Sequence, residues 1–417
     1  MRQKQWIRKD LLRFVAANLL AVLICFPCSG TLVAQTASGP SPLLDPNTKV
    51  EWWFVFKFNS EAFPQSCAAP QRACPFGGQA QPYQQFSQQF AYASSANHTL
   101  QQGGGCLGGT TTDPLGATFN QVYTGNFFFV LWNDQFYGDP ILTEGAPWGH
   151  SKGMLAWDQN GNGLVLQVST PDWPGSGSPA TLRNSGNTLG CILTDNDIMV
   201  SQHFFSLQLN KDDVVIVLKA LANASVLTDP SKPQIVKNGG PAEIQTLVEA
   251  LGKESSSKVP TKDRLSSGIV LISKPSKLNV PPWQMVSAML GGEPLRAATW
   301  WTKPEIPTTT ASTVIGCWDA SLGKPGAVEI ATSGTWNGKT IGLEGLAEPN
   351  GNHAKVGVST GSHTYAIFGD MNQQGSLAPP RCSSSQNGRG GLFYVVDDAP
   401  LFHSVQDLIK ASAAPSR

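Results

Sequence analysis

Two stretches of this sequence repeat one pattern, and this repeat constrains the fold more than any other feature. Residues 149–153 read Gly-His-Ser-Lys-Gly, and residues 352–355 read Asn-His-Ala-Lys. An apolar run, a turn rich in small polar residues and a second apolar run follow each copy, at 154–168 and at 356–368. Two apolar runs around such a turn are typical of paired strands. The repeat therefore predicts the same strand–turn–strand unit in both halves of the chain.

The His-x-Lys spacing places an imidazole and an ammonium on one side of a strand, because residues i and i+2 point the same way. If the copies face one another, His150, Lys152, His353 and Lys355 offer two imidazoles and two cations to one tetrahedral anion. One imidazole can attack phosphorus while the other protonates the leaving oxygen, and the lysines hold the other oxygens. A single His-x-Lys is common by chance, and a lysine there can be a solvated strand end. Two copies with matching flanks favour a shared site.

The length of 417 residues, of which 41% are hydrophobic, allows one large core or two modest ones. We predict buried strands at 50–58, 126–132 and 391–396, and helices at 243–251, 282–290 and 404–411. Residues 213–221 are also predicted to form a strand, and 198–209 form either a helix or a strand. The polar residues 59–118 are predicted to be long loops.

The N-terminus has the pattern of an export signal, with basic residues before the apolar stretch 14–26 and a cleavage region at 33–35. A membrane anchor is the alternative, but this stretch is shorter than the roughly 20 residues that span a bilayer. We expect a signal peptide at 1–35 and an exported protein, in the periplasm or the medium. The compact signal favours a bacterial source.

The charge balance excludes a strongly basic nucleic-acid binder. The sequence has 29 Lys and Arg and 29 Asp and Glu, and residues 1–35 contain five of the basic and one of the acidic side chains. The rest of the chain therefore has 24 basic and 28 acidic side chains. A polyanionic substrate must then be held by a local cationic site, or bound at acid pH, where carboxylates and histidines take up protons. Six of the eight cysteines follow residue 35. This even number predicts disulfides in an exported chain. The six cysteines contain no Cys-x-x-Cys pair, which argues against a zinc site.

Several motifs, taken in their order along the chain, resemble the deoxyribonuclease II family of the phospholipase D superfamily. The motif at 149–153, with Asp158 beyond it, resembles the first family motif. The motif at 352–355, followed by Gly-Asp-Met-Asn at 369–372 and Arg-Gly-Gly at 389–391, resembles the second. Further landmarks occur at 50–53, 132–135 and 186–191. The resemblance therefore covers most of the chain after the signal.

This resemblance implies a mixed α/β fold of the phospholipase D type. Two pseudo-symmetric halves, each with a mixed β-sheet flanked by helices, are expected to share a cleft. We place the first half at 36–222, a connecting segment at 223–262 and the second half at 263–417. The family also implies metal-independent cleavage of DNA at acid pH, leaving 3′-phosphate ends through a phosphohistidine. DNA is then the partner, with no cofactor and no metal.

The family pattern carries catalytic roles over to His150, Lys152, His353 and Lys355, and also to Asn372 and Asp370. His150 is expected to be the nucleophile and His353 the acid, and the reverse assignment stays open. One neutral and one protonated imidazole are needed, which predicts an optimum in mild acid because histidine titrates near ~6.5. Arg389 and Asp158 are expected to bind substrate, although Asp158 also suits a turn.

The sequence departs from the family at Gln167, where a histidine is common. Asp134 and His203 are interpreted as structural residues. Cys317 and Cys382 flank the second motif and are the expected disulfide pair. Two rival functions remain: an exported phosphodiesterase acting on lipid or another diester, and an inactive binding relative. The missing basic excess favours the first rival, whereas the ordered landmarks favour DNA and the intact His and Lys pairs favour an enzyme.

Overall fold

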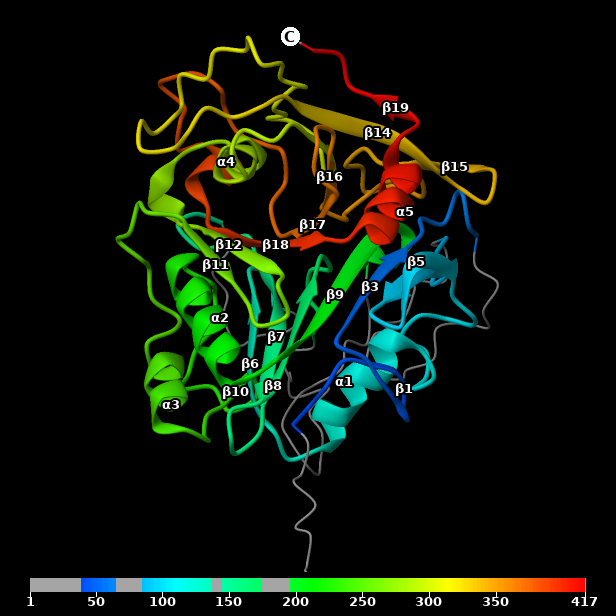
Figure 1. The fold of residues 1–417 in the computed structure, drawn as a ribbon, viewed down its shortest axis with the longest axis vertical. Helices are drawn as coiled ribbons and strands as arrows, with labels where there is room; N and C mark the ends of the chain where they lie inside the picture. The colour runs from blue at the N-terminus through cyan, green and yellow to red at the C-terminus, as the bar shows by residue number, and fades with distance from the viewer. Residues whose placement is uncertain (1–38, 65–84, 137–144, 175–195, 417) are drawn as a thin grey trace, which may run out of the picture. The chain divides into compact units, whose positions relative to one another are not determined.

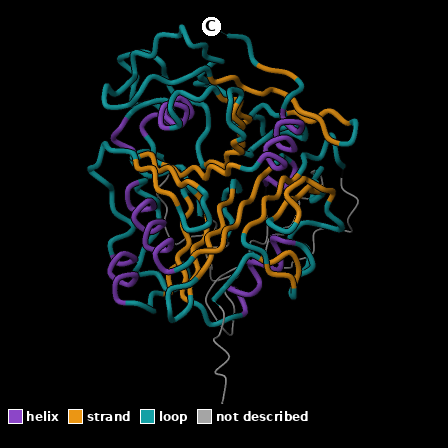
Figure 2. The backbone as a smooth tube through the Cα atoms, viewed as in Figure 1, coloured by secondary structure: helices purple, strands orange, loops and turns teal. Residues whose placement is uncertain are grey.

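The computed structural model describes residues 39–64, 85–136, 145–174 and 196–416. The signal peptide expected at 1–35, the landmark at 186–191 and the cysteines at 67, 74 and 191 lie outside these residues. Within the described part, two large β-sheets and five α-helices form one compact unit (Figures 1 and 2). No helix in these ranges is long and apolar enough to cross a membrane. Cys317 and Cys382 form the expected disulfide.

The first sheet has eight strands and contains the first His-x-Lys. Every described pairing in it is antiparallel, so the mixed sheet predicted for this half is wrong here. Short turns join several of its strands, and such turns require antiparallel neighbours. In spatial order the strands are β10 (Val236–Lys237), β6 (Phe128–Asn133), β7 (Lys152–Trp157), β8 (Gly163–Val168), β9 (Gln202–Leu209), β3 (Trp52–Lys57), β4 (Phe90–Ser94) and β5 (Asn97–Gln102).

The second sheet has nine strands and contains the second His-x-Lys. It is mixed, because β13 and β14 run parallel while the other pairs are antiparallel. Eight strands follow one another in space, and β19 (Ser412–Ala413) pairs with β14. The eight are β11 (Thr261–Arg264), β12 (Val270–Lys274), β18 (Gly391–Asp397), β17 (Tyr365–Gly369), β16 (Val356–Ser359), β13 (Leu295–Ala298), β14 (Val328–Trp336) and β15 (Lys339–Gly342).

The predicted strand–turn–strand units after both motifs are confirmed. β7 and β8 form one antiparallel pair, and β16 and β17 form the other. The central strands of the two sheets pack against each other through aromatic rings. Phe54 of β3 stacks on Phe368 of β17 at 4.2 Å between ring centroids, and Phe205 of β9 lies 5.4 Å from Tyr394 of β18. This packing brings the two hairpins, and the motifs that precede them, to one place.

Helices flank the sheets, and three of them lie where the sequence predicts: α3 (Ala242–Glu249), α4 (Pro282–Met289) and α5 (Ala399–Ile409). The predicted loops at 59–118 are interrupted by β4, β5 and the start of α1 (Pro114–Thr124), which begins at an Asp113 cap followed by proline. Residues 196–209 form the 3-10 turn η1 (Asn196–Met199) and then β9. The remaining short elements are β1 (Leu43–Asp45), β2 (Thr48–Lys49), η2 (Ser276–Leu278) and η3 (Ser385–Gly388).

The strand predicted at 213–221 is wrong, since these residues form most of helix α2 (Lys211–Asn223). Its run of Val and Ile favours strands by propensity. A capping box overrides that preference. The Asn210 side-chain oxygen accepts from the Asp213 backbone amide at 2.9 Å, and the Asp213 carboxylate accepts from the Asn210 backbone amide at 3.3 Å. The helix then buries Val214, Val217 and Leu221 at helical spacing, in contact with both sheets.

Replacing Asn210 with alanine is expected to lower the free energy of unfolding by about 1 kcal/mol, because the first turn of α2 loses its side-chain acceptor. Urea unfolding followed by circular dichroism measures this change. Asn210→Asp keeps the capping oxygen and is expected to retain the wild-type midpoint. Equal losses in both variants would contradict a capping role.

Candidate active site

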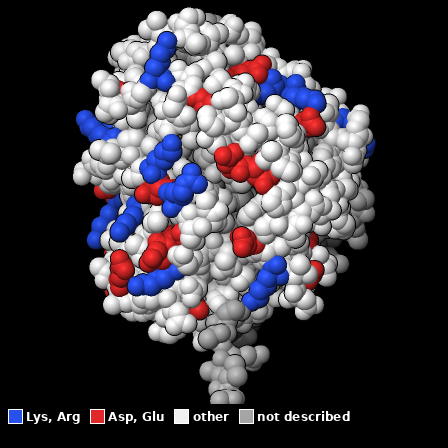
Figure 3. Space-filling view, viewed as in Figure 1, with Lys and Arg blue, Asp and Glu red and all other residues white. Residues whose placement is uncertain are grey.

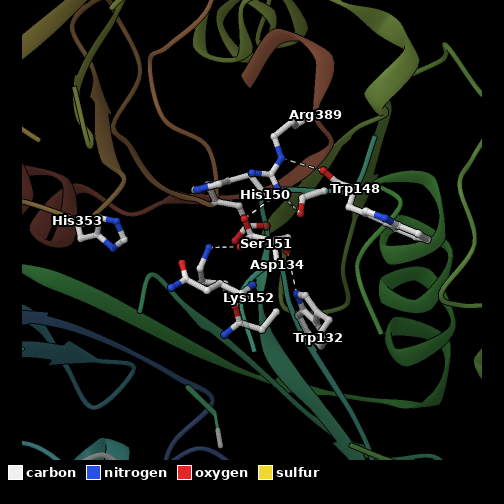
Figure 4. Close-up of polar contacts among 12 residues, drawn as sticks. Trp132, Asp134, Trp148, His150, Ser151, Lys152, His353 and Arg389 are labelled. Carbon is white, nitrogen blue, oxygen red and sulfur yellow. Dashed lines mark hydrogen bonds and ion pairs between the residues drawn. The ribbon is translucent and has the colours of Figure 1, made fainter. Parts of the chain in front are cut away.

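A cavity of about 390 Å³ lies where the two motifs meet. Both motif histidines line it, together with side chains from segments that are distant in sequence. The lining residues are Asp134, Gln135, Gly145, His150, Lys152, Pro171, His353, Gln386 and Arg389. Figure 4 shows His150, Lys152, Asp134 and Arg389 grouped together, with His353 standing apart from them on another segment.

His150 is buried just before β7 and is fixed at two points. Its backbone amide donates to the Gly390 carbonyl at 2.8 Å, and its ring Nδ1 lies 2.7 Å from the Asp370 carbonyl oxygen. A carbonyl only accepts, so Nδ1 must carry the proton of this hydrogen bond. In the neutral ring the lone pair is therefore on Nε2. Burial, reinforced by the charge of Lys152, holds the pKa of His150 well below its ordinary value.

Asp134 links the two cations of the first half. It directly follows β6, whose last residue Asn133 pairs with Lys152 of β7, so the antiparallel register places both side chains at one sheet edge. Lys152 pairs with one carboxylate oxygen, and Arg389 Nη2 donates to the other at 2.8 Å. Burial opposes this charge, but Lys152, His150 and Arg389 outweigh it and keep the pKa of Asp134 far below its ordinary value.

The interpretation of Asp134 as merely structural therefore missed a residue that lines the cavity. The available signal was its position, immediately after a buried strand that neighbours the motif strand. Arg389 also donates to the backbone oxygens of Trp148 at 2.9 Å and of Gly149 at 3.2 Å. It thus anchors the loop that delivers His150 as well as lining the cavity.

The second half presents His353 and Lys355. The His353 amide donates to the Ser201 carbonyl at 2.7 Å, and the Lys355 ammonium donates to the His353 carbonyl. The Lys355 amide donates to Nδ1 of the buried His203 at 3.1 Å. Trp300 meets the His353 ring edge-on at 4.7 Å between centroids. Burial, followed by the charges of Lys355 and Lys152, holds the pKa of His353 well below its ordinary value.

Asp370 lies behind His150, in contact with both sheets. Its carboxylate accepts from Gln167 Nε2 at 3.0 Å and from the Leu392 amide at 2.9 Å. Burial raises the pKa of Asp370 to about 7, so the group is largely protonated in mild acid. Gln167 thus supports the residue whose carbonyl orients His150.

The two remaining candidates lie away from the cavity wall. The Asn372 backbone amide donates to Gln386 Oε1 at 3.3 Å. Gln386 lines the cavity, so Asn372 contacts a lining residue and is not one itself. Asp158 lies at the β7–β8 turn, at the opposite end of β7 from Lys152. Its carboxylate accepts from the amides of Asn160 and Asn162 at 2.9 Å, which makes it a turn residue. The structure does not bring Asp158 to the site.

Equivalent contacts recur around the two motifs. The carbonyls that receive the His150 and His353 amides, Gly390 and Ser201, each directly precede the first residue of β18 or β9. The amides of Leu392 and His203, one position into these strands, donate to the side chains of Asp370 and Ser169 at 2.9 and 2.8 Å. These acceptors directly follow β17 and β8.

Buried lysines repeat the same correspondence. Lys57 ends β3 and donates to the Ile198 carbonyl at 2.7 Å, ahead of β9. Lys274 ends β12 and donates to the Asn387 carbonyl at 2.7 Å, ahead of β18. Each lysine therefore fixes the loop that leads into the strand beside it.

The positive charge of the site is local. On the face drawn in Figure 3, Lys and Arg are interspersed with Asp and Glu. Around the cavity, Lys152, Lys355 and Arg389 outnumber the carboxylate of Asp134, so the site favours a bound anion. No group of three or more His, Cys, Asp or Glu that could hold a metal ion occurs among the described residues.

Comparison with known proteins identifies the same family that the motifs resemble. The family model described as Deoxyribonuclease II matches residues 41–414, which is nearly all of the described chain. Deoxyribonuclease-2-alpha of Sus scrofa is 28% identical over 182 residues. That alignment covers 42% of this chain and 43% of the relative, so the chain spans less than half the length of that protein.

Proposed function

Because this chain belongs to the deoxyribonuclease II family, we propose that it cuts DNA phosphodiester bonds in the cavity between the two motifs. One observation carries this proposal: His150 and His353, distant in sequence, line a single cavity together with Lys152 and Arg389. Two imidazoles and excess positive charge suit a phosphodiester anion, as the repeat predicts.

We propose that the site is built from two phospholipase D-like halves related by a pseudo-two-fold axis. Support comes from the paired backbone contacts of His150 with Gly390 and of His353 with Ser201. The order of elements supports it too. β9 leads into α2, β18 leads into α5, and a side-chain cap starts each helix.

The proposed reaction proceeds in two steps. His150 Nε2 attacks phosphorus and forms a P–N bond, while the bond from phosphorus to the 5′-oxygen breaks and that oxygen takes a proton from His353. Water then attacks phosphorus and gives a proton to His353, and the P–N bond breaks to leave a 3′-phosphate and neutral His150. Lys152, Lys355 and Arg389 stabilise the charge that develops on the phosphoryl oxygens.

His150 suits the role of nucleophile because the Asp370 carbonyl holds its proton on Nδ1, which leaves the Nε2 lone pair for attack. The depressed pKa of His150 keeps this ring neutral in mild acid. His353 must be protonated to act as the acid. Its depressed pKa means that this proton is lost as the pH rises, so the reaction needs a low pH. The phosphodiester anion raises the pKa of both rings when it binds. Together these effects favour an acid optimum.

We therefore expect the purified protein, without residues 1–35, to nick and then degrade plasmid DNA at about pH 5 in excess EDTA. Activity should fall steeply as the pH rises toward neutrality, because His353 loses its proton there. Gel electrophoresis follows the cutting, and end-labelling tests for 3′-phosphates. Cutting that appears only at neutral pH with added magnesium would overturn this mechanism.

The absence of a basic excess, with 24 basic and 28 acidic side chains after residue 35, favours one alternative, a phosphodiesterase acting on lipid. Anionic phospholipid vesicles offered at pH 5 test it. Release of headgroups without any DNA cleavage would replace the present proposal, and no activity on either substrate would indicate a binding relative. We also propose export after removal of residues 1–35, which fits the Cys317–Cys382 disulfide.

A further inference from the structure

Trp300 lies beside the proposed acid, just beyond the end of β13. Its indole meets the His353 imidazole at an interplanar angle of 85°. The residue as a whole is half-buried. It packs close to Gly345, where a Cβ atom would stand 2.8 Å from the Trp300 Cγ. The indole is therefore in direct contact with one of the two histidines that line the cavity.

The loop that carries Trp300 is fixed by hydrogen bonds before and after this residue in the sequence. The Gln373 backbone amide donates to Thr299 Oγ1 at 3.0 Å, and Gln374 Nε2 donates to Thr302 Oγ1 at 2.9 Å. Both donors belong to the segment that follows β17, close to Asn372. Trp300 is therefore positioned before substrate arrives, so little conformational freedom is lost when a ligand packs on it.

In the proposed reaction the substrate is oriented by the chemistry itself. Displacement in line with His150 places the leaving 5′-oxygen on the far side of phosphorus, where His353 protonates it. The nucleotide attached to that oxygen therefore lies next to His353, and Trp300 is an aromatic side chain in contact with that histidine. Every base has a π-face that can stack on an indole, whatever the sequence.

We propose that Trp300 is a stacking platform for the nucleobase of the nucleotide that carries the leaving 5′-oxygen. This inference rests on the proposed function and adds a base-binding subsite to it. It explains how a chain without a basic excess holds DNA, since stacking adds to the charge contacts of Lys152 and Arg389. Base–aromatic stacking contributes roughly five- to a hundred-fold or more per base.

A single-stranded oligonucleotide with one tetrahydrofuran abasic residue tests this subsite. In the wild-type protein, cleavage of the bond 5′ to the abasic residue should be about ten-fold slower than cleavage of the same bond in the unmodified strand. That bond releases the oxygen of the residue that lacks a base. In Trp300→Ala, cleavage of this bond in the unmodified strand should slow to a similar rate. The ratio of the cleavage rate in the unmodified strand to that in the abasic strand should then fall to about one. Trp300→Phe should restore much of the wild-type ratio.

A ratio that stays near ten in Trp300→Ala, with all bonds slowed alike, would mean that Trp300 only orients His353 and would overturn the proposal. A wild-type ratio near one would overturn it as well. Trp318→Ala is the matched control, because Trp318 is also half-buried but lines a separate pocket with Leu322 and Pro325. That variant should keep the wild-type ratio. If the wild-type protein cuts neither strand, the proposed function itself fails.

Discussion

Replacing His150 with asparagine is expected to reduce kcat for DNA cleavage by about 10⁴-fold or more, because the reaction loses its nucleophile. Replacing His353 with asparagine should cost about 10²- to 10⁴-fold, the usual contribution of a general acid. Initial rates on a labelled oligonucleotide at pH 5 measure both losses. Because the two residues act in one reaction, the double variant should be little worse than His150→Asn alone.

The leaving group separates the two roles. In thymidine 3′-(4-nitrophenyl phosphate), nitrophenolate departs without a proton, so His353→Asn should release nitrophenolate in the first turnover at close to the wild-type rate. Hydrolysis of the phosphohistidine, in which His353 accepts a proton from water, should stay slow in this variant. His150→Asn should stay inactive, because no leaving group replaces the attacking atom. The opposite pattern would exchange the roles of the histidines. Equal recovery of both variants would refute the shared site.

Loss of the fold must be excluded as the cause of these losses. Both variants should keep the wild-type circular dichroism spectrum. Their free energies of unfolding in urea should stay within about 1 kcal/mol of the wild-type value, since each asparagine retains polar atoms near the lost ring nitrogens. His403→Asn is a suitable control, because His403 is exposed on α5 and lies outside the cavity lining. It should cut DNA at the wild-type rate.

The sequence predicted the parts of this site that depend on local pattern. The alternation of the motifs and the runs at 154–168 and 356–368 were sufficient for both hairpins, because strand pairing over a short turn is a local property. Helix α2 was missed because strand propensity at Val214 and Val215 competes with a cap at Asn210, and tertiary burial decided the outcome. Propensity alone could not weigh these terms.

Residues whose roles depend on neighbours in space were harder to predict. Asp158 matched the motif by spacing, but six residues of strand carry it about 20 Å from Lys152. Asp134 has no motif of its own, and its role arises from the register of β6 against β7. Trp300 reaches His353 only because β13 pairs with β16, which begins just after the second motif. Such contacts follow from sheet order, which the sequence pattern did not specify.

Asp134 supports the second large prediction. Asp134→Asn is expected to lower the free energy of unfolding by about 3–5 kcal/mol, because Lys152 and Arg389 remain buried without their carboxylate. The pKa of Asp134 is depressed in the folded protein, so this stabilisation is fully present above the ordinary carboxyl pKa of about 3.9 and is lost as the pH falls through the folded value. Urea unfolding at pH 5 and pH 7 should therefore give similar deficits.

The same substitution should move the pH profile in a direction that a purely structural role does not predict. The negative charge of Asp134 raises the pKa of His150 and of His353, so its removal lowers both. Less His353 is then protonated at pH 5, kcat falls there, and the optimum shifts to lower pH. KM for DNA should not rise, because Lys152 and Arg389 lose an internal competitor for the phosphate. An unchanged optimum with an increased KM would mean that Asp134 only maintains the fold. A shifted optimum would mean that one buried carboxylate sets both the stability of this site and the pH at which its acid works.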